Sequence, residues 1–398
     1  MLDDTWIVVA GGPPAWGDYG SQATRMADAF WKLGYHVLYI ECGGSRTPFH
    51  RVVSQRRQPA HSVVADLERR GFFVMRASQL PGFPFAFPEP VRRWNSARTS
   101  KRAAQFLAAS GAARLIVCHY GWYLPDLFAA AHESVRHVYD CTDDHANAPA
   151  SCRQGWQRRH LVRTESRLLA KADLTVFCSP ELAAARAEMA GTSAQIPMGV
   201  DAEWFARPVV RDPHLARRLP PHGIGAPRIG YIGRVTERSN WAMVRAAAAS
   251  TPDWQWVIAG PLDRAQPKGP ENLHWLGAIR YQEMGGWLQH WDAGIVPHVA
   301  GTTFNQRSSP MKLLEYLAAG LTVASTDIPA ARRIAARLPH LAVLADDETS
   351  SSFVRAVSLA LRPPAWQREA GRLFARQYTW EKRARIVLEL LGERPRNG

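Results

Sequence analysis

Short apolar runs alternate with longer amphipathic stretches from the start of the chain. Residues 6–10 are apolar, and two glycines and two prolines follow them. Residues 21–33 then place apolar side chains at helical spacing, and residues 35–40 form a second apolar run. An apolar run, an amphipathic helix and another apolar run are typical of a β-α-β unit, whose two strands lie parallel in one sheet.

The alternation continues as two series, which a proline-rich polar stretch at residues 199–227 separates. Such a stretch is typical of a linker between domains. The pattern therefore predicts an α/β fold built from two Rossmann-like domains with an interdomain cleft. Further strands are predicted at residues 72–75, 115–118, 137–139, 174–177, 228–232, 254–259, 272–275, 294–296, 321–325 and 341–344.

Composition and charge narrow the class of protein. The chain has 398 residues, 46% of them hydrophobic, and a formal net charge of +14. This composition suits a globular protein, and the basic charge favours an anionic partner such as nucleic acid, anionic lipid or a phosphorylated substrate. Nucleic acid is not expected, because the sequence lacks a helix-turn-helix, zinc-finger or RNA-binding signature.

The sequence also predicts a cytoplasmic location. No apolar run is long enough to span a bilayer, and the N-terminus is acidic where an export signal would be basic. The cysteines show no C-x-x-C spacing, so we expect small, reduced core residues. They are Cys42, Cys118, Cys141, Cys152 and Cys178.

The most informative stretch is a short helix predicted after the apolar run at residues 294–296. Ser309 suits its N-cap, Pro310 its first position and Gly320 the position just after its end. This register puts Lys312 at the third helical position, where the partial positive charge of a helix N-terminus disfavours a cation. A bound phosphate would relieve that repulsion, so the helix start is a candidate phosphate site.

Two neighbouring residues bear on this candidate site. Arg307 adds a second cation, and Glu315 lies about one turn deeper on the face of Lys312. A carboxylate in that place can accept two hydrogen bonds from a ribose diol. The alternative is a solvated Lys–Glu pair on the helix surface, and the spacing alone leaves both interpretations open.

The segment at residues 309–325 resembles the signature of GT-B glycosyltransferases of the group 1 type, Pro-x-Lys-x-x-Glu-Tyr-x-Ala-x-Gly followed by a strand. The resemblance covers most of the chain and is nearest to bacterial surface-polysaccharide enzymes of the teichuronic-acid and xanthan-glucuronosyltransferase kind. The other segments that fit are residues 137–144, 172–173, 179, 197–201, 230–234, 252–261, 272–277 and 291–297.

This resemblance implies a nucleotide diphosphate-sugar as donor substrate, with a UDP-sugar preferred, and no cofactor. It places Lys312 and the Met311 and Lys312 amides at the diphosphate, and Glu315 at the ribose. Gly233 and Arg234 would line the other side of the phosphates, with an ordinary tight turn as the alternative. The donor sugar would contact loop residues such as His298, Thr302, Thr303 and Asn305, and Arg307 is a further candidate donor-binding residue.

The resemblance also divides the chain into three parts. Residues 1–205 would form an acceptor-binding domain, and residues 206–377 would form the nucleotide-sugar-binding domain. Residues 378–398 would form a C-terminal helix that returns to the N-terminal domain and permits hinge closure.

A departure from the family pattern bears on the mechanism. Many retaining members carry a Glu-x7-Glu pair, but the first of these positions is Arg307 here, which favours an inverting enzyme with a carboxylate base. Asp144 is the preferred base and Asp143 the second candidate, because both follow the strand predicted at residues 137–139. A helix cap or an ion pair with Arg153 is the alternative role.

A metal ion is not expected. Asp143, Asp144 and His145 form only a weak ligand set, and the chain has no Asp-x-Asp sequence. A helix terminus and cations would instead stabilise the leaving diphosphate.

Three more residues are candidate acceptor contacts. His119 and Tyr120 follow a predicted strand, with a core or capping role as their alternative, and Asp18 follows the first strand-helix turn.

Basic residues gather in two N-terminal segments. Residues 92–102 hold five cations and no acid, and four further cations recur every four residues from Arg159 to Lys171. Residues 80–88 add aromatic side chains, and cations beside aromatics suit an anionic membrane surface. We therefore expect a peripheral enzyme at the inner membrane face with a lipid-linked or saccharide acceptor, although solvated helix faces explain the cations equally well.

Two other functions stay open at this point. A nucleotide-sugar epimerase would use the same two-domain scaffold, with acid and base residues around the bound sugar. A non-catalytic polyanion-binding protein would account for the charge alone.

Overall fold

The computed structural model describes residues 5–12, 21–42, 63–78, 89–121, 124–128, 134–149, 155–207, 219–220, 226–262, 268–362 and 365–396. The chain divides into two compact units. Unit 1 comprises Met1–Pro197 and Trp380–Gly398, and unit 2 comprises Met198–Thr379. The division falls after Pro197, a few residues before the boundary at residue 205 that the sequence suggested.

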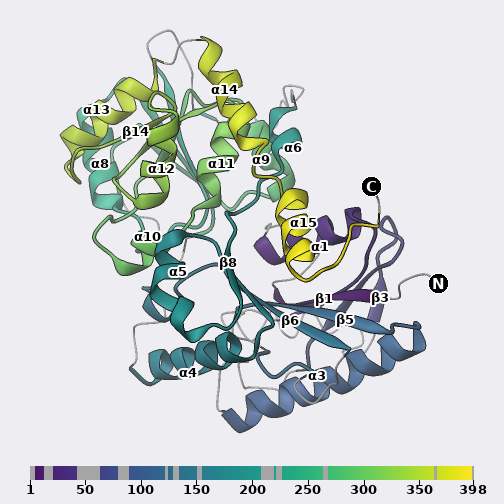
Figure 1. Ribbon diagram of the computed structural model, residues 1–398. Helices are drawn as coiled ribbons and strands as arrows, with labels where there is room; N and C mark the ends of the chain where they lie inside the picture. Colours follow the sequence, from purple (N-terminus) through teal and green to yellow (C-terminus); the bar gives the residue numbers. More distant parts are fainter. Residues whose placement is uncertain are drawn as a thin grey trace. The chain divides into compact units, whose positions relative to one another are not determined.

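Unit 1 is built on an eight-stranded sheet (Figure 1). The strand order is β3-β4-β2-β1-β5-β6-β7-β8, and every neighbouring pair is parallel except β3 with β4. The strands are β1 (Thr5–Gly12), β2 (His36–Glu41), β3 (Val63–Ala65), β4 (Phe72–Arg76), β5 (Arg114–Tyr120), β6 (Val135–Cys141), β7 (Leu174–Phe177) and β8 (Ser193–Gln195). Strand β1 is buried along its whole length, as a continuous apolar run in a parallel sheet predicts.

Helices cover both faces of this sheet. Helix α1 (Gln22–Lys32) starts where the Ser21 side chain accepts a hydrogen bond from the Thr24 amide, and it packs against β1, β2 and α15. Helix α3 (Glu89–Ala109) contributes Ala103 and Leu107 to a core with alternate residues of β1. The other helical elements are α4 (Gly155–Lys171), α5 (Pro180–Arg186), α15 (Trp380–Leu390) and the short 3-10 helices η2 (His145–Asn147) and η3 (Ala187–Met189).

Unit 2 is built on a fully parallel six-stranded sheet of order β11-β10-β9-β12-β13-β14. Its strands are β9 (Arg228–Ile232), β10 (Gln255–Ala259), β11 (Leu273–Gly277), β12 (Ala293–Val296), β13 (Thr322–Ser325) and β14 (Ala342–Leu344). Its helices are α6 (Ala202–Ala206), α8 (Trp241–Ser250), α9 (Tyr281–Leu288), α10 (Thr303–Arg307), α11 (Met311–Ala318), α12 (Pro329–Arg337), α13 (Ser350–Ala360) and α14 (Ala365–Ala375).

Successive strand residues in unit 2 enter two different apolar cores. Along β10, Trp256 and Ile258 pack with α8 and α13, whereas Val257 and Ala259 pack with α11. Side chains alternate across a strand, so these cores lie on opposite faces of the sheet. Both faces are therefore covered by helices, which makes the unit a doubly wound α/β domain.

Candidate active site

The strand order of unit 2 reverses between β9 and β12. From β9 the chain proceeds outward to β10 and β11, and from β12 it proceeds the other way to β13 and β14. Ligands of open α/β sheets bind outside the carboxyl ends of the strands at such a reversal. Gly233 follows β9 and His298 follows β12, so two of the predicted donor-binding residues lie at this edge.

Helix α11 is held to the same edge by a tyrosine. The Tyr316 hydroxyl accepts a hydrogen bond of 2.9 Å from the amide of Ile232, the last residue of β9. Pro310, and not Ser309, is the N-cap, because Pro310 has an extended backbone with ψ 117° and the helix starts one residue later than predicted. Lys312 is therefore the second helical residue, not the third, while Gly320 follows the helix with φ +81° as expected.

Gly233 and Lys312 lie against each other. Gly233 has φ +134°, and a Cβ atom added there would stand 3.3 Å from Cε of Lys312. The Lys312 ammonium also lies 5.0 Å from the ring centroid of Tyr231. A glycine in this backbone conformation leaves room beside the cation, which is what a closely approaching phosphate requires. Arg234 is the next residue, and it is exposed.

His298 adds a buried neutral ring. The residue is fully buried, its Nδ1 lies 2.9 Å from the Ser239 hydroxyl, and its Nε2 has no hydrogen-bond partner among the described residues. Burial lowers the pKa of His298 well below 6.5, and the charges of Arg238 and Lys312 lower it further. The imidazole is therefore uncharged at neutral pH, with one nitrogen available to a ligand that reaches it.

Asn305 has a different role from the predicted one. It is fully buried, and its amide donates to the carbonyls of Arg238 (2.9 Å) and Val299 (2.8 Å). Its Oδ1 accepts a bond of 2.8 Å from Nε of Arg238. Because Asn305 is fully buried and both sides of its amide are engaged, its contacts favour a role in positioning Arg238 over direct contact with a sugar.

Arg238 was not identified from the sequence. Besides Asn305, it donates a bond of 2.6 Å to the Ser308 hydroxyl, and its guanidinium lies 5.0 Å from the ring centroid of Phe304. It therefore ties the loop after β9 to helix α10. Its place five residues beyond Gly233 was the only available signal.

The remaining donor-side candidates differ in exposure. Glu315 is buried, three residues after Lys312 on α11, while Met311 and Lys312 are half-buried at its start. Arg307 ends α10 and is half-buried. Together these groups suit a diphosphate joined to polyhydroxyl groups. Lys312 and the start of α11 supply positive charge for the diphosphate, and Glu315 and the neutral His298 are able to hydrogen-bond to hydroxyl groups.

In unit 1 the predicted bases have unequal surroundings. Asp144 is fully buried, with Oδ1 2.9 Å from Arg186 and Oδ2 accepting a bond of 2.8 Å from the Asn147 amide. It stands at the N-cap position of η2 but makes no capping bond with its side chain. Asp143 is partly exposed. This geometry does not support Asp144 as the preferred base, because a base must reach the acceptor, and it favours Asp143. Arg153, the ion-pair partner considered from the sequence, lies outside the described residues.

His119 and Tyr120 are both buried at the end of β5. His119 Nε2 lies 3.1 Å from Nδ1 of His137, and burial lowers its pKa to about 3. Burial also raises the pKa of Tyr120, which hydrogen-bonds to Asp140. These contacts fit the alternative core role, and Asp18 lies outside the described residues.

The basic segments are only partly exposed. Arg92, which the sequence placed among surface cations, is fully buried on α3. Arg163 and Arg167 of α4 are exposed as expected. The aromatic residues at 80–88 lie outside the described part of the chain.

Comparison with known proteins bears on unit 2 most directly. Residues 226–362 match the family model described as "Glycosyl transferases group 1". They form a group 1 glycosyltransferase domain. The chain is also 24% identical over 276 residues to a putative teichuronic acid biosynthesis glycosyltransferase, TuaH, of Bacillus subtilis. That match covers 64% of this chain and 66% of the relative, so it spans slightly less than two thirds of the relative's length.

Solved structures share the architecture of both units. Sucrose-phosphate synthase from Thermosynechococcus elongatus aligns with a TM-score of 0.73 and 16% identity, and the alignment covers 98% of each chain. Anabaena HepE in complex with UDP and glucose gives 0.63 and 12%, covering 98% of this chain and 99% of that one. WaaG, a glycosyltransferase of lipopolysaccharide biosynthesis, gives 0.60 and 15%, covering 96% and 99%. Both units therefore have the architecture of the GT-B fold, which confirms the predicted fold class, and the match at residues 226–362 agrees with the predicted group 1 family.

Three further features of the described residues bear on the expectations from the sequence. No group of three or more His, Cys, Asp or Glu side chains suited to a metal ion is found among them. No described helix combines the length and the apolar character needed to cross a bilayer. Of the five cysteines, Cys42, Cys118, Cys141 and Cys178 are free and buried, as expected, and Cys152 lies outside the described residues.

Proposed function

We propose that the protein transfers a sugar from a UDP-sugar to an acceptor hydroxyl. The observation that carries this proposal is the meeting of Lys312, at the start of α11, with Gly233, at the strand-order reversal of a group 1 domain. A cation and helix amides at such an edge suit a diphosphate. Similar structures point the same way, since HepE was solved with UDP and with UDP-glucose.

Each donor-side residue receives a role in this proposal. Lys312 and the amides of Met311 and Lys312 bind the diphosphate and stabilise the negative charge that grows on it as it leaves. Glu315 accepts hydrogen bonds from the ribose, and His298 Nε2 contacts the donor sugar or its phosphate. Arg234 and Arg307 supply further positive charge, and no metal ion or cofactor takes part.

The reaction is proposed as a single inverting displacement. The acceptor oxygen attacks the anomeric carbon, the bond from that carbon to the phosphate oxygen breaks, and UDP leaves with the bonding electrons. Asp143 takes the proton of the acceptor hydroxyl. The similarity to a putative teichuronic acid biosynthesis glycosyltransferase supports a role in surface-polysaccharide synthesis. Within that role, the proposed acceptor is a lipid-linked saccharide at the inner membrane face.

Calorimetric titration of nucleotides into the purified protein tests the donor assignment. We expect UDP to bind more tightly than GDP, and Lys312→Ala to weaken UDP binding by about 10- to 100-fold, because a charge-assisted hydrogen bond contributes about 1.5–3 kcal/mol. Lys268→Ala is the matched control, since Lys268 is an exposed lysine of the same unit. Equal UDP affinity in wild type and Lys312→Ala would refute the diphosphate assignment.

A further inference from the structure

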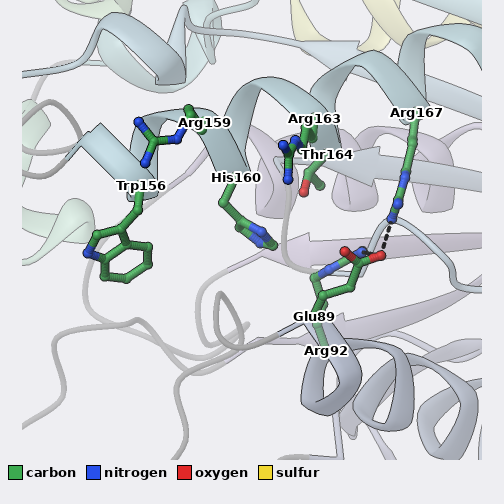
Figure 2. A pocket seen from close by; sticks show the side chains of 8 residues that line it. All are labelled: Glu89, Arg92, Trp156, Arg159, His160, Arg163, Thr164 and Arg167. Atoms are coloured by element: carbon green, nitrogen blue, oxygen red, sulfur yellow. Dashed lines mark hydrogen bonds and ion pairs between the residues drawn. The ribbon is translucent and has the colours of Figure 1, made fainter.

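Helices α3 and α4 of unit 1 enclose a pocket of about 280 Å³ (Figure 2). Six of its lining residues come from α4, and two come from the first turn of α3. In Figure 2, His160, Arg163 and Arg167 extend from α4 toward the start of α3. The lining residues are Glu89, Arg92, Trp156, Arg159, His160, Arg163, Thr164 and Arg167.

The lining is strongly positive. Four arginines and one glutamate give it a net charge of +3 when His160 is neutral. Burial is the largest cause that lowers the pKa of His160; the charges of Arg92, Arg167 and Arg163 lower it further, and Glu89 acts against them. The histidine therefore reports a local excess of positive charge, which an anion would offset.

Arg92 is the decisive residue of this pocket. Its side chain is 0% exposed, and its Nη1 pairs with Oδ2 of Asp126 at 2.8 Å. Its Nη2 lies 3.7 Å from the Glu89 carboxylate, and neither Nη2 nor Nε has a hydrogen-bond partner among the described residues. Nε2 of His160 is likewise buried without such a partner. A buried donor without an acceptor costs about 1–3 kcal/mol, so an anion that supplied acceptor atoms to these described donors would be stabilised.

The start of α3 also favours a bound anion. Amides in the first turn of a helix have no acceptor within the helix, and they carry partial positive charge. Glu89 occupies part of this region and accepts a bond of 2.8 Å from Arg167. The pocket volume is many times the roughly 10–15 Å³ that one water requires by the same kind of measure, so a larger anion has room.

We propose that this pocket binds the phosphate or diphosphate group of the acceptor, with Arg92, Arg163 and Arg167 as hydrogen-bond donors. Several arginines around one anion suit phosphate, because each planar guanidinium is able to donate two parallel bonds to its oxygens. The link to the acceptor rests on the proposed function, whereas phosphate binding by the pocket does not. The phosphate belongs either to a lipid-linked acceptor or to a soluble phosphorylated one.

Titration of inorganic pyrophosphate, followed by calorimetry, tests the soluble form of this chemistry. All proteins carry Lys312→Ala, which removes the principal cation of the proposed donor site. We expect Arg163→Ala to weaken binding at least tenfold and Arg163→Lys to restore part of the loss. Arg158→Ala, on the same helix but outside the pocket, should stay within twofold. Arg92→Met provides a second variant if it folds, and Arg163→Ala keeps the test valid if it does not.

Vesicle flotation distinguishes the two sources of phosphate. Vesicles of phosphatidylcholine with phosphatidic acid present a terminal lipid phosphate, and vesicles of phosphatidylcholine alone do not. Binding to phosphatidic acid that Arg163→Ala weakens supports a lipid phosphate, and Arg163-dependent binding of pyrophosphate supports a soluble one. The proposal is overturned if neither probe binds, or if Arg163→Ala and Arg158→Ala bind both probes equally. None of these readouts uses UDP or transferase activity, so failure of the proposed function would be seen separately.

Discussion

The two units reverse their strand order in the same way but use the reversal differently. In unit 1 the reversal lies between β1 and β5, and in unit 2 it lies between β9 and β12. At each reversal a glycine with positive φ lies near the end of one central strand: Gly11 in β1 and Gly233 just after β9. A buried histidine with a lowered pKa lies at the other central strand: His119 in β5 and His298 just after β12. The shared topology therefore does not decide which edge carries a ligand, and the side chains must do so.

The contacts of the glycines show the first difference. A Cβ atom on Gly11 in unit 1 would stand 2.4 Å from the carbonyl oxygen of Tyr120, so that glycine allows two strands to close on each other. Gly233 in unit 2 faces the aliphatic end of Lys312 instead. One glycine serves packing of the backbone, and the other leaves space beside a cation.

The histidines show the second difference. His119 of unit 1 lies 3.1 Å from His137 and its ring stacks on that residue. His298 of unit 2 has an unpartnered Nε2 among the described residues, and the charges of Arg238 and Lys312 act on it. Among the described residues, the histidine of unit 1 therefore has a partner for its Nε2, whereas the Nε2 of His298 in unit 2 has none and lies near two cations. In unit 1, Arg92 between α3 and α4 has two buried guanidinium nitrogens, Nε and Nη2, with no hydrogen-bond partner among the described residues.

The largest predicted effect is a loss of transfer rate, and it distinguishes Asp143 from Asp144, the two carboxylates after β6. We predict that Asp143→Asn lowers the transfer rate by about 10²- to 10⁴-fold, because it removes the proposed base. Its unfolding free energy should change by less than about 0.5 kcal/mol, because the side chain is partly exposed. Steady-state kinetics and urea unfolding measure the two quantities.

Asp144→Asn is the matched control, with the opposite profile. It removes one of the two buried carboxylates that pair with Arg186, because Glu165 remains 3.0 Å from the Arg186 Nε. We therefore expect the free energy of unfolding to fall by about 1–3 kcal/mol, the usual cost of losing a hydrogen bond to a charged group. A full loss of rate in Asp144→Asn with no loss of stability would reverse the assignment and return the base to Asp144.

Local sequence patterns predicted most of the fold and one helix of the site. Continuous apolar runs identified β1, β9 and β12, because strands buried on both faces need no polar alternation. The short segment around Lys312 predicted a helix and its glycine end correctly. It misplaced the start by one residue, because proline with an extended backbone serves as a cap as well as a first residue.

The polar partners could not be predicted in this way. Asn305 and Arg238 are 67 positions apart, and Asp144 and Arg186 are 42 apart, yet both pairs are in direct contact. Such contacts depend on which strands are neighbours in the sheet. The spacing of residues within one segment does not indicate that order. The burial of Arg92 was missed for the same reason, since its partner Asp126 is outside its helix.

The next largest predicted effect is a pH-dependent loss of stability in unit 1, caused by His119. The pKa of His119 is about 3 in the folded chain and about 6.5 when unfolded, so unfolding takes up a proton below pH 6.5. The stabilisation is present above pH 6.5 and is lost as the pH falls toward 3. We predict a loss of about 2 kcal/mol between pH 6.5 and pH 5 from this residue, at about 1.36 kcal/mol for each pH unit.

Hydrogen exchange of the β5 amides at several pH values measures this loss within unit 1. His119→Gln should flatten the dependence by about the same amount, even if it lowers stability at pH 7. If wild type and variant lose stability in parallel as the pH falls, His119 is not the neutral buried group that we describe.

The smallest effect tests the corresponding histidine of unit 2. Ser239→Ala removes the hydroxyl 2.9 Å from His298 Nδ1, and loss of one hydrogen bond costs about 1 kcal/mol. If that bond orients the ring so that Nε2 meets the donor, UDP-sugar affinity should fall about fivefold, as 1.4 kcal/mol is tenfold. Ser250→Ala, which alters a serine at the end of α8 in the same unit, is the control. Nitrogen NMR of His298 adds an independent readout: its Nε2 signal should shift on adding UDP-sugar while the His119 signals stay in place. A shift at His119 instead would mean that the edge of unit 1, and not that of unit 2, responds to the donor.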